Sequence, residues 1–153
     1  MSIEIQQIRM DDVDELYDIE LECFSTEEAF TKEQIRHLIK NKNSIGFVAK
    51  VDHKVVGFTI GLINKNEFGD LIGHVVTIDV AMEYRRRGVG IKLLKKLESE
   101  FKTKNVKTCF LEVRIDNKAA QSLYKKLGYV ETVCLKDYYG KGVHGILFKK
   151  KLK

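Results

Sequence analysis

Six consecutive residues near the middle of the chain, from Arg85 to Gly90, have the composition of an anion-binding loop. The β-branched residues of 73–80 before them predict a strand, and apolar residues recur with helical spacing after them. Glycines let backbone N–H groups converge on an anion, and a helix start adds unpaired donors and the positive end of its dipole. Glycine and arginine also occur in ordinary turns, so the order of strand, loop and helix carries the prediction of a pyrophosphate site.

The spacing of these glycines excludes the two commonest nucleotide-binding loops. The chain contains no G-x-x-x-x-G-K-[ST] motif, and no G-x-G-x-x-G followed by an acidic residue about twenty positions later. The loop instead reads Arg-x-x-Gly-x-Gly. A second motif lies downstream, with LEVR at 111–114, then Asn117 and Ala120, then LYKKLGY at 123–129.

In this order the two motifs resemble the acetyl-coenzyme A (acetyl-CoA) site of the GCN5-related N-acetyltransferase (GNAT) superfamily. The branch that they resemble is that of the RimI and Ard1 N-terminal acetyltransferases. The resemblance covers essentially the whole chain and is tightest from Ile78 to Tyr139. It implies the GNAT acyltransferase fold, a twisted, mixed and mostly antiparallel sheet with helices on both faces.

Local patterns predict the elements that position these motifs. Thr31 and Gln34 form a capping box that starts a helix, and Gly128 ends a helix that begins at Asn117. An earlier helix starts at Asp11 or Asp12, and the helix after the glycine loop ends near Asn105. Strands are predicted at 3–8, 44–50, 54–63, 71–80, 106–113, 129–135 and 146–152. Hairpins followed by strands that alternate with helices favour a mixed sheet.

The resemblance implies acetyl-CoA as cosubstrate and no metal. The strand before the loop would present its backbone to the acetyl group, and main-chain amides of the loop would hold the pyrophosphate. Asp79 and Met82 depart from the family pattern, and the Asp79 charge suits an anionic ligand only if its side chain points to the other face of the strand. The cofactor-binding residues implied are Ile78, Asp79, Val80, Arg85, Arg86, Arg87, Gly88, Val89, Gly90, Ile91, Asn117 and Tyr124.

Acetyl transfer to an amine requires a group that accepts the proton of the amine and a group that protonates the departing thiolate. Glu112, at the end of an apolar strand, is the first candidate for the base, and the resemblance gives the matching glutamate this role. The alternative is a structural ion pair with Arg114 or a lysine. His74 competes for the same role because strand alternation turns it to the same face as Ile78, although a lone strand histidine is often structural.

Tyr124 is the candidate for the acid. It lies seven residues after Asn117, so the two side chains share one face of the predicted helix. The resemblance gives the matching tyrosine the role of protonating the thiolate, and an ordinary core aromatic is the alternative.

The resemblance places the peptide substrate between the loop joining the first two helices and a tyrosine-rich loop near the C-terminus. The candidates here are Phe24 and Glu27 in the first loop and Tyr138 and Tyr139 in the second. The two tyrosines would form a narrow slot that admits an α-amine and excludes a lysine side chain, unless they are surface aromatics. Both loops depart from the usual family sequence, so the preferred first residue stays open.

The composition limits the partners. At 153 residues the chain is long enough for a single domain, 1–153, with one core. It shows neither a membrane-spanning run nor a signal peptide, and its three cysteines have apolar neighbours, which predicts buried, reduced thiols and a cytoplasmic protein. The net charge of +5 suits the phosphates of CoA or a ribosome surface, while direct nucleic-acid binding lacks a motif.

The combined prediction is an acetyl-CoA-dependent N-α-acetyltransferase of protein or peptide N-termini, which transfers the acetyl group directly in a ternary complex. One alternative is a small-amine (polyamine or antibiotic) or lysine N-acetyltransferase of the same fold. Another is a non-catalytic module that binds acetyl-CoA. The sequence leaves open whether the protein is a monomer or a homodimer.

Overall fold

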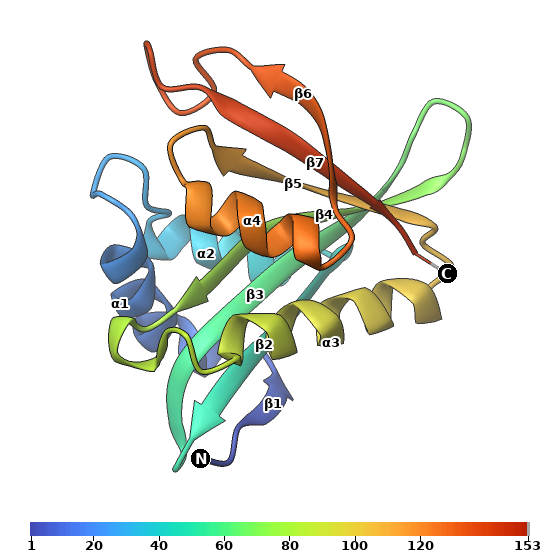
Figure 1. The fold of residues 1–153 in the computed structure, drawn as a ribbon. Helices are drawn as coiled ribbons and strands as arrows, with labels where there is room; N and C mark the ends of the chain where they lie inside the picture. Colours follow the sequence, from blue (N-terminus) through green and yellow to red (C-terminus); the bar gives the residue numbers. More distant parts are fainter. Residues whose placement is uncertain (153) are drawn as a thin grey trace.

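A seven-stranded sheet with the strand order β1-β2-β3-β4-β5-β7-β6 forms the centre of the molecule (Figure 1). The computed structural model describes residues 1–152. All neighbouring strands are antiparallel except β4 and β5, which run parallel, so the predicted mixed, mostly antiparallel sheet is confirmed. The strands are β1 Glu4–Gln7, β2 Ser44–Val51, β3 Lys54–Lys65, β4 Leu71–Val80, β5 Thr108–Arg114, β6 Val130–Leu135 and β7 Gly145–Lys151.

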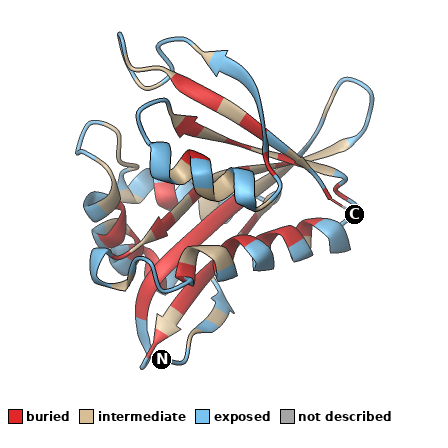
Figure 2. Cartoon of the chain, viewed as in Figure 1, coloured by how far each residue is buried: buried red, intermediate tan, exposed pale blue. Residues whose placement is uncertain are grey.

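Helices cover both faces of the sheet (Figure 1). The helices α1 (Val13–Cys23) and α2 (Lys32–Lys40) pack on one face, while α3 (Val89–Thr103) and α4 (Lys118–Lys126) lie on the other. Each face of the sheet has its own hydrophobic cluster. Figure 2 shows that the buried residues lie along the central strands and along the side of α3 that packs on the sheet. The apolar stripe predicted for α3 is confirmed, because Val89, Leu93, Leu94, Leu97 and Phe101 are all buried.

The parallel strands β4 and β5 separate soon after they meet. They pair only where Ile72, Gly73 and His74 face the first three residues of β5. Beyond that point β4 continues beside β3 as far as Val80, and β5 continues beside β7 as far as Arg114. Helix α4 lies in front of the gap that opens between them (Figure 1). The separated strand edges present backbone donors and acceptors to whatever extended ligand lies between them.

The capping box at Thr31 and the helix stop at Gly128 are confirmed, whereas Asp12, at the N-cap of α1, makes no side-chain cap hydrogen bond. The Thr31 N–H donates to Gln34 Oε1 at 2.8 Å, and the Gln34 N–H donates to Thr31 Oγ1 at 3.1 Å. Gly128 follows the last turn of α4 with φ +96°, a conformation in which glycine has no Cβ penalty.

The prediction of three buried thiols is wrong for one of them. Cys109 is buried and Cys23 is partly buried, but Cys134 is exposed; all three are free. Cys134 lies on β6, an edge strand of the sheet, where its neighbour Val133 is also exposed and Leu135 is only partly buried. No helix among residues 1–152 has the length and apolarity needed to cross a bilayer. Within the same range no group of three His, Cys, Asp or Glu side chains has the arrangement of a metal site.

Candidate active site

The glycine loop leads into α3 through two residues with positive φ. Arg86 has φ +62° and Gly88, the N-cap residue of α3, has φ +83°. No side chain caps the helix, so the amides of its first turn, at Val89, Gly90 and Ile91, are left to an external acceptor. A Cβ built at Gly88 would meet no atom within 4 Å, so the space beside this residue is open. The loop therefore fits a pyrophosphate bound through main-chain donors.

The arginine side chains of the loop do not all point outward. Arg85 Nε donates to the Val80 carbonyl oxygen at 3.1 Å, and Arg85 Nη2 lies 3.4 Å from Cys23 Sγ. The Arg87 guanidinium lies over the Tyr84 ring, 5.4 Å from its centroid. Arg85 thus anchors the loop to the end of β4, and its contribution to the anion site is structural.

Replacing Gly88 with alanine tests the loop. We expect the Kd of acetyl-CoA to rise about tenfold, because a Cβ at positive φ costs about 1 kcal/mol and intrudes into the anion site. Calorimetric titration measures this. Gly69 is the matched control, since it also has φ +83° and open space around its Cβ but lies in the β3–β4 turn. Equal losses of acetyl-CoA affinity in Gly88→Ala and Gly69→Ala would show that the loop is not the anion site.

A cavity of about 270 Å³ lies where β4 and β5 separate. Helix α4, the α1–α2 loop and the β6–β7 loop complete its walls. Seven predicted site residues line it, namely Phe24, Ile78, Glu112, Asn117, Tyr124, Tyr138 and Tyr139. Lining residues that the sequence did not indicate include Glu20, Glu28, Phe30, Val76 and Arg114. A second hollow, of about 360 Å³, lies beside β1, β2 and the end of α3 and contains none of the predicted residues.

Glu112 and His74 form a hydrogen-bonded pair across the start of the gap between β4 and β5. Glu112 Oε1 lies 2.8 Å from His74 Nε2, and only 12% of the glutamate side chain is exposed. The His74 ring stacks on Phe110, with 4.5 Å between the ring centroids. Glu112 lines the cavity and His74 does not. The arrangement makes Glu112 the group that can reach a substrate and His74 the group that orients it.

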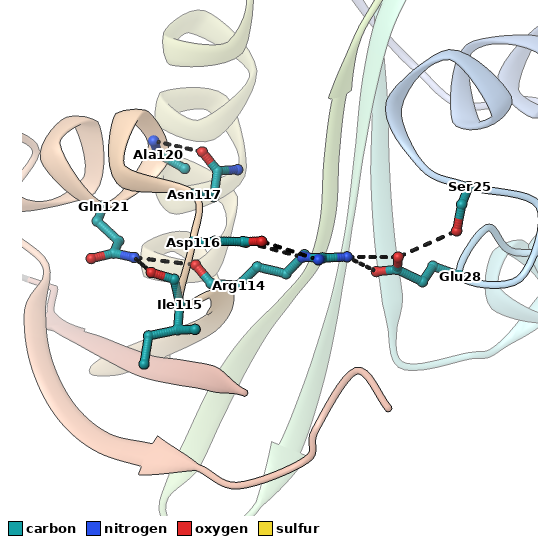
Figure 3. Close-up of polar contacts among 8 residues, drawn as sticks. All are labelled: Ser25, Glu28, Arg114, Ile115, Asp116, Asn117, Ala120 and Gln121. Atoms are coloured by element: carbon teal, nitrogen blue, oxygen red, sulfur yellow. Dashed lines mark hydrogen bonds and ion pairs between the residues drawn. The ribbon is translucent and has the colours of Figure 1, made fainter. Parts of the chain in front are cut away.

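Arg114 forms ion pairs with Glu28 of the α1–α2 loop and with Asp116 (Figure 3). The alternative of an ion pair between Glu112 and Arg114 is therefore wrong. Arg114 Nη1 lies 3.0 and 2.7 Å from the two Glu28 carboxylate oxygens, and its Nε and Nη2 donate to Asp116, each at 3.1 Å. The ion pair ties the α1–α2 loop to the start of α4. Glu27, the predicted contact, is exposed outside the cavity, because the turn at Ser25 directs the next residue, Glu28, inward.

Tyr124 projects from α4 into the cavity. Its ring meets that of Tyr129 edge to face, 5.8 Å between centroids. Burial, with a smaller effect of the Asp79 charge, raises the pKa of Tyr124 to about 12. Asn117 caps α4 through its Oδ1, which accepts from the Ala120 N–H at 3.1 Å, so it fixes the helix that carries Tyr124. The phenol is thus held in its protonated, proton-donating form.

Tyr138 and Tyr139 form one wall of the cavity. Their rings meet edge to face with 4.9 Å between centroids, and the Tyr139 N–H donates to the Val143 carbonyl at 3.0 Å. Burial, and next the nearby Glu112 carboxylate, raise the pKa of both tyrosines. The wall therefore stands directly beside the candidate base.

Removing the Tyr138 ring should weaken binding of the peptide substrate and leave binding of acetyl-CoA nearly unchanged. We expect Tyr138→Ala to raise the KM of a peptide substrate about tenfold, since a half-exposed aromatic contact contributes about 1–2 kcal/mol. Steady-state kinetics with each substrate varied in turn measures this. Phe68→Ala is the matched control, because Phe68 is an exposed aromatic on the distant β3–β4 turn. A comparable rise in the acetyl-CoA KM would contradict a role in peptide binding alone.

The Asp79 side chain points away from the face of β4 on which an anionic cofactor is predicted to bind. This agrees with its negative charge, which would repel such a cofactor. A Cβ at Gly90 of α3 would lie 3.5 Å from Val80 and 3.9 Å from Ile78, so these two side chains face α3. The Asp79 side chain lies on the other face of β4, fully buried, where it accepts a hydrogen bond from the Thr77 hydroxyl and lies beside Glu20 of α1. The Asp79 side chain therefore does not place its charge on the face of β4 that packs against α3.

Comparison with known proteins identifies the family. Residues 13–129 match the family described as Acetyltransferase (GNAT) family. The chain belongs to the GNAT acetyltransferases. It is 34% identical to an N-alpha-acetyltransferase of Sulfurisphaera tokodaii, over 90% of this chain and 86% of that protein. It is 33% identical to an N-alpha-acetyltransferase of Saccharolobus solfataricus, over 97% and 92%.

The solved structures support the same fold for this acetyltransferase. Ard1 of Thermoplasma volcanium superimposes with a TM-score of 0.88 and 26% identity, covering 100% of this chain and 99% of that one. The predicted RimI and Ard1 resemblance is therefore confirmed, and the protein is an N-acetyltransferase.

Proposed function

We propose that this acetyltransferase transfers the acetyl group of acetyl-CoA directly to the N-terminal α-amine of a protein or peptide, with Glu112 as base and Tyr124 as acid. It is an N-α-acetyltransferase like its archaeal relatives, whose lengths it nearly matches. The observation that carries the assignment of roles is that Glu112 and Tyr124 line one cavity from β5 and α4, between the separated strands.

Acetyl-CoA supplies an activated thioester, and the side chains of the cavity supply the proton transfers. With His74 Nε2–H donating to Glu112 Oε1, the second oxygen, Oε2, is left to accept a proton from the α-ammonium, directly or through a water. Backbone N–H groups at the end of β4 would stabilise the negative charge that develops on the carbonyl oxygen. Tyr124 then returns a proton to the leaving sulfur.

The buried cysteines favour direct transfer over an acyl-enzyme. Cys23 Sγ donates to the Val80 carbonyl oxygen at 3.6 Å, and burial, followed by the Asp79 charge, raises its pKa to about 11. Burial likewise raises the pKa of Cys109 to about 11. A thiol must ionise to act as a nucleophile, so neither of these two residues is suited to accept the acetyl group. The free thiols also support our placement of the enzyme in the cytoplasm.

A substrate panel tests the proposed acceptor. We expect turnover with peptides whose α-amine is free, none with the same peptides blocked at the N-terminus, and none at their internal lysines. The physical reason is that the tyrosine wall and the α1–α2 loop, which the ion pair of Arg114 with Glu28 holds, line the same cavity and would confine the approach of the amine. Release of CoA is measured with varied first residues, a ribosomal-protein N-terminal peptide, a polyamine and an aminoglycoside.

The same panel separates the alternatives. Turnover of the polyamine or the aminoglycoside but of no peptide would identify a small-amine acetyltransferase. Acetylation of lysine side chains in N-terminally blocked peptides would point to the lysine enzyme. Binding of acetyl-CoA without turnover of any amine would support the alternative of a non-catalytic binding module.

A further inference from the structure

Two buried carboxyl groups, Glu20 and Asp79, meet where α1 packs on β4. Both side chains are fully buried, and the two carboxyl groups lie close enough for Glu20 to raise the pKa of Asp79. Glu20 also lines the cavity of the active site. Two adjacent carboxylates in a dry environment repel each other and lose their hydration, so such a pair ordinarily retains one proton between its members.

The remaining hydrogen bonds of the pair locate that proton. Glu20 Oε2 accepts from the Phe30 N–H at 2.9 Å, and Asp79 Oδ1 accepts from the Thr77 hydroxyl. The second oxygens of the pair, Glu20 Oε1 and Asp79 Oδ2, are buried and accept no hydrogen bond from any donor among residues 1–152. Ionised carboxylates only accept hydrogen bonds, so these two oxygens need a proton between them. Burial, and next the contact with Glu20, raise the pKa of Asp79 well above its usual value, which is the direction expected when the pair retains a proton.

The ionisable groups around the pair can balance one negative charge but not two. Among the described residues Arg85, in the glycine loop, is the cation whose charge acts on Asp79. Its guanidinium already contacts the Val80 carbonyl and the Cys23 thiol of α1. The other ionisable groups facing Asp79 are Cys23 itself and Tyr124 of α4, both of which carry a raised pKa and stay neutral.

The pair connects the two parts of the active site that bind different substrates. Through the Phe30 N–H, Glu20 holds the end of the α1–α2 loop, whose residues Phe24, Glu28 and Phe30 line the cavity. Asp79 belongs to the stretch of β4 assigned to the acetyl group. We propose that Glu20 and Asp79 share a single proton and, as positioning residues, fix the α1–α2 loop against β4 for binding of the peptide N-terminus. The part that concerns the peptide rests on the proposed function.

The shared proton is tested without any substrate. The infrared spectrum of the wild-type protein in D₂O at neutral pH should contain the carbonyl stretch of a protonated carboxyl group, and Asp79→Asn should remove it. Asp70→Asn, in the exposed β3–β4 turn, is the matched control and should keep the band. A wild-type protein without this band, or a band that survives in Asp79→Asn, would overturn the shared proton whatever the enzyme acetylates.

The positioning role is tested by comparing two substitutions at Asp79. The asparagine amide can still donate to Glu20, whereas alanine leaves Glu20 buried without this partner. We therefore expect the peptide KM of Asp79→Ala to exceed that of Asp79→Asn about tenfold, the effect of one lost buried hydrogen bond, with acetyl-CoA KM changed much less. Equal peptide KM values in the two variants, measured on folded protein, would contradict the role.

The pH dependence provides a second readout. Raising the pH removes the shared proton from the wild-type pair and leaves two buried charges, while Asp79→Asn has no such proton to lose. The ratio of wild-type to Asp79→Asn peptide KM should therefore rise in the alkaline range. Titration of the peptide amine affects both enzymes equally and cancels in this ratio. A ratio that does not change with pH would overturn the proposal even if both variants are active.

Discussion

Replacing Glu112 with glutamine should lower kcat/KM for a peptide by about 10²- to 10⁴-fold, the usual contribution of a general base. Glutamine has the same shape and can still accept the hydrogen bond from His74 Nε2, but it cannot take a proton from the attacking amine. The Kd of acetyl-CoA should stay nearly unchanged, because Glu112 lies on the peptide side of the cavity beside Tyr138. Steady-state kinetics and calorimetric titration measure the two quantities.

The controls separate the base from the residue that orients it. Glu27→Gln removes an exposed carboxylate from the α1–α2 loop and should leave the rate unchanged. His74→Ala should cost less than Glu112→Gln, since His74 acts through Glu112 and does not line the cavity. Near-normal rates in both Glu112→Gln and His74→Ala would show that the base lies elsewhere.

Tyr124→Phe should lower kcat by about 10²-fold while the affinity for acetyl-CoA is retained, because only the proton donor for the leaving thiolate is removed. The donor must be protonated, so its activity is lost as pH rises through its pKa. Since that pKa is raised from 10.0 to about 12, loss of this proton should not lower the wild-type kcat near pH 10. A pH profile of kcat, with saturating substrates, measures this.

Tyr129→Phe is the matched control for Tyr124. Tyr129 touches the Tyr124 ring, but its hydroxyl donates to Glu98 Oε2 at 2.7 Å inside the core. Its removal leaves Glu98 short of a buried partner and should lower the free energy of unfolding by about 1–3 kcal/mol while kcat is spared. If Tyr124→Phe instead weakens acetyl-CoA binding and spares kcat, Tyr124 is a packing residue.

The sequence by itself determined the features that depend on neighbouring residues. The glycine loop before α3 follows from glycines placed between a strand and a helix. The capping box at Thr31 and the stop at Gly128 follow from local hydrogen bonding and φ preferences. The strand limits of β4, Leu71 and Val80, were predicted to the residue from its β-branched run. Two motifs in one order were also enough to indicate the family.

Only the tertiary structure decided which side chains act together. His74 and Glu112 are 38 residues apart, and Arg114 and Glu28 are 86 residues apart, so no local pattern relates them. A one-residue difference in the α1–α2 loop put Glu28 in the cavity instead of Glu27, and the edge position of β6 exposed Cys134. Strand register and helix packing set these contacts, and they turn side chains toward or away from the cavity one residue at a time. For the same reason the sequence of β4 could not show that the neighbour of Asp79 is Glu20, buried on α1.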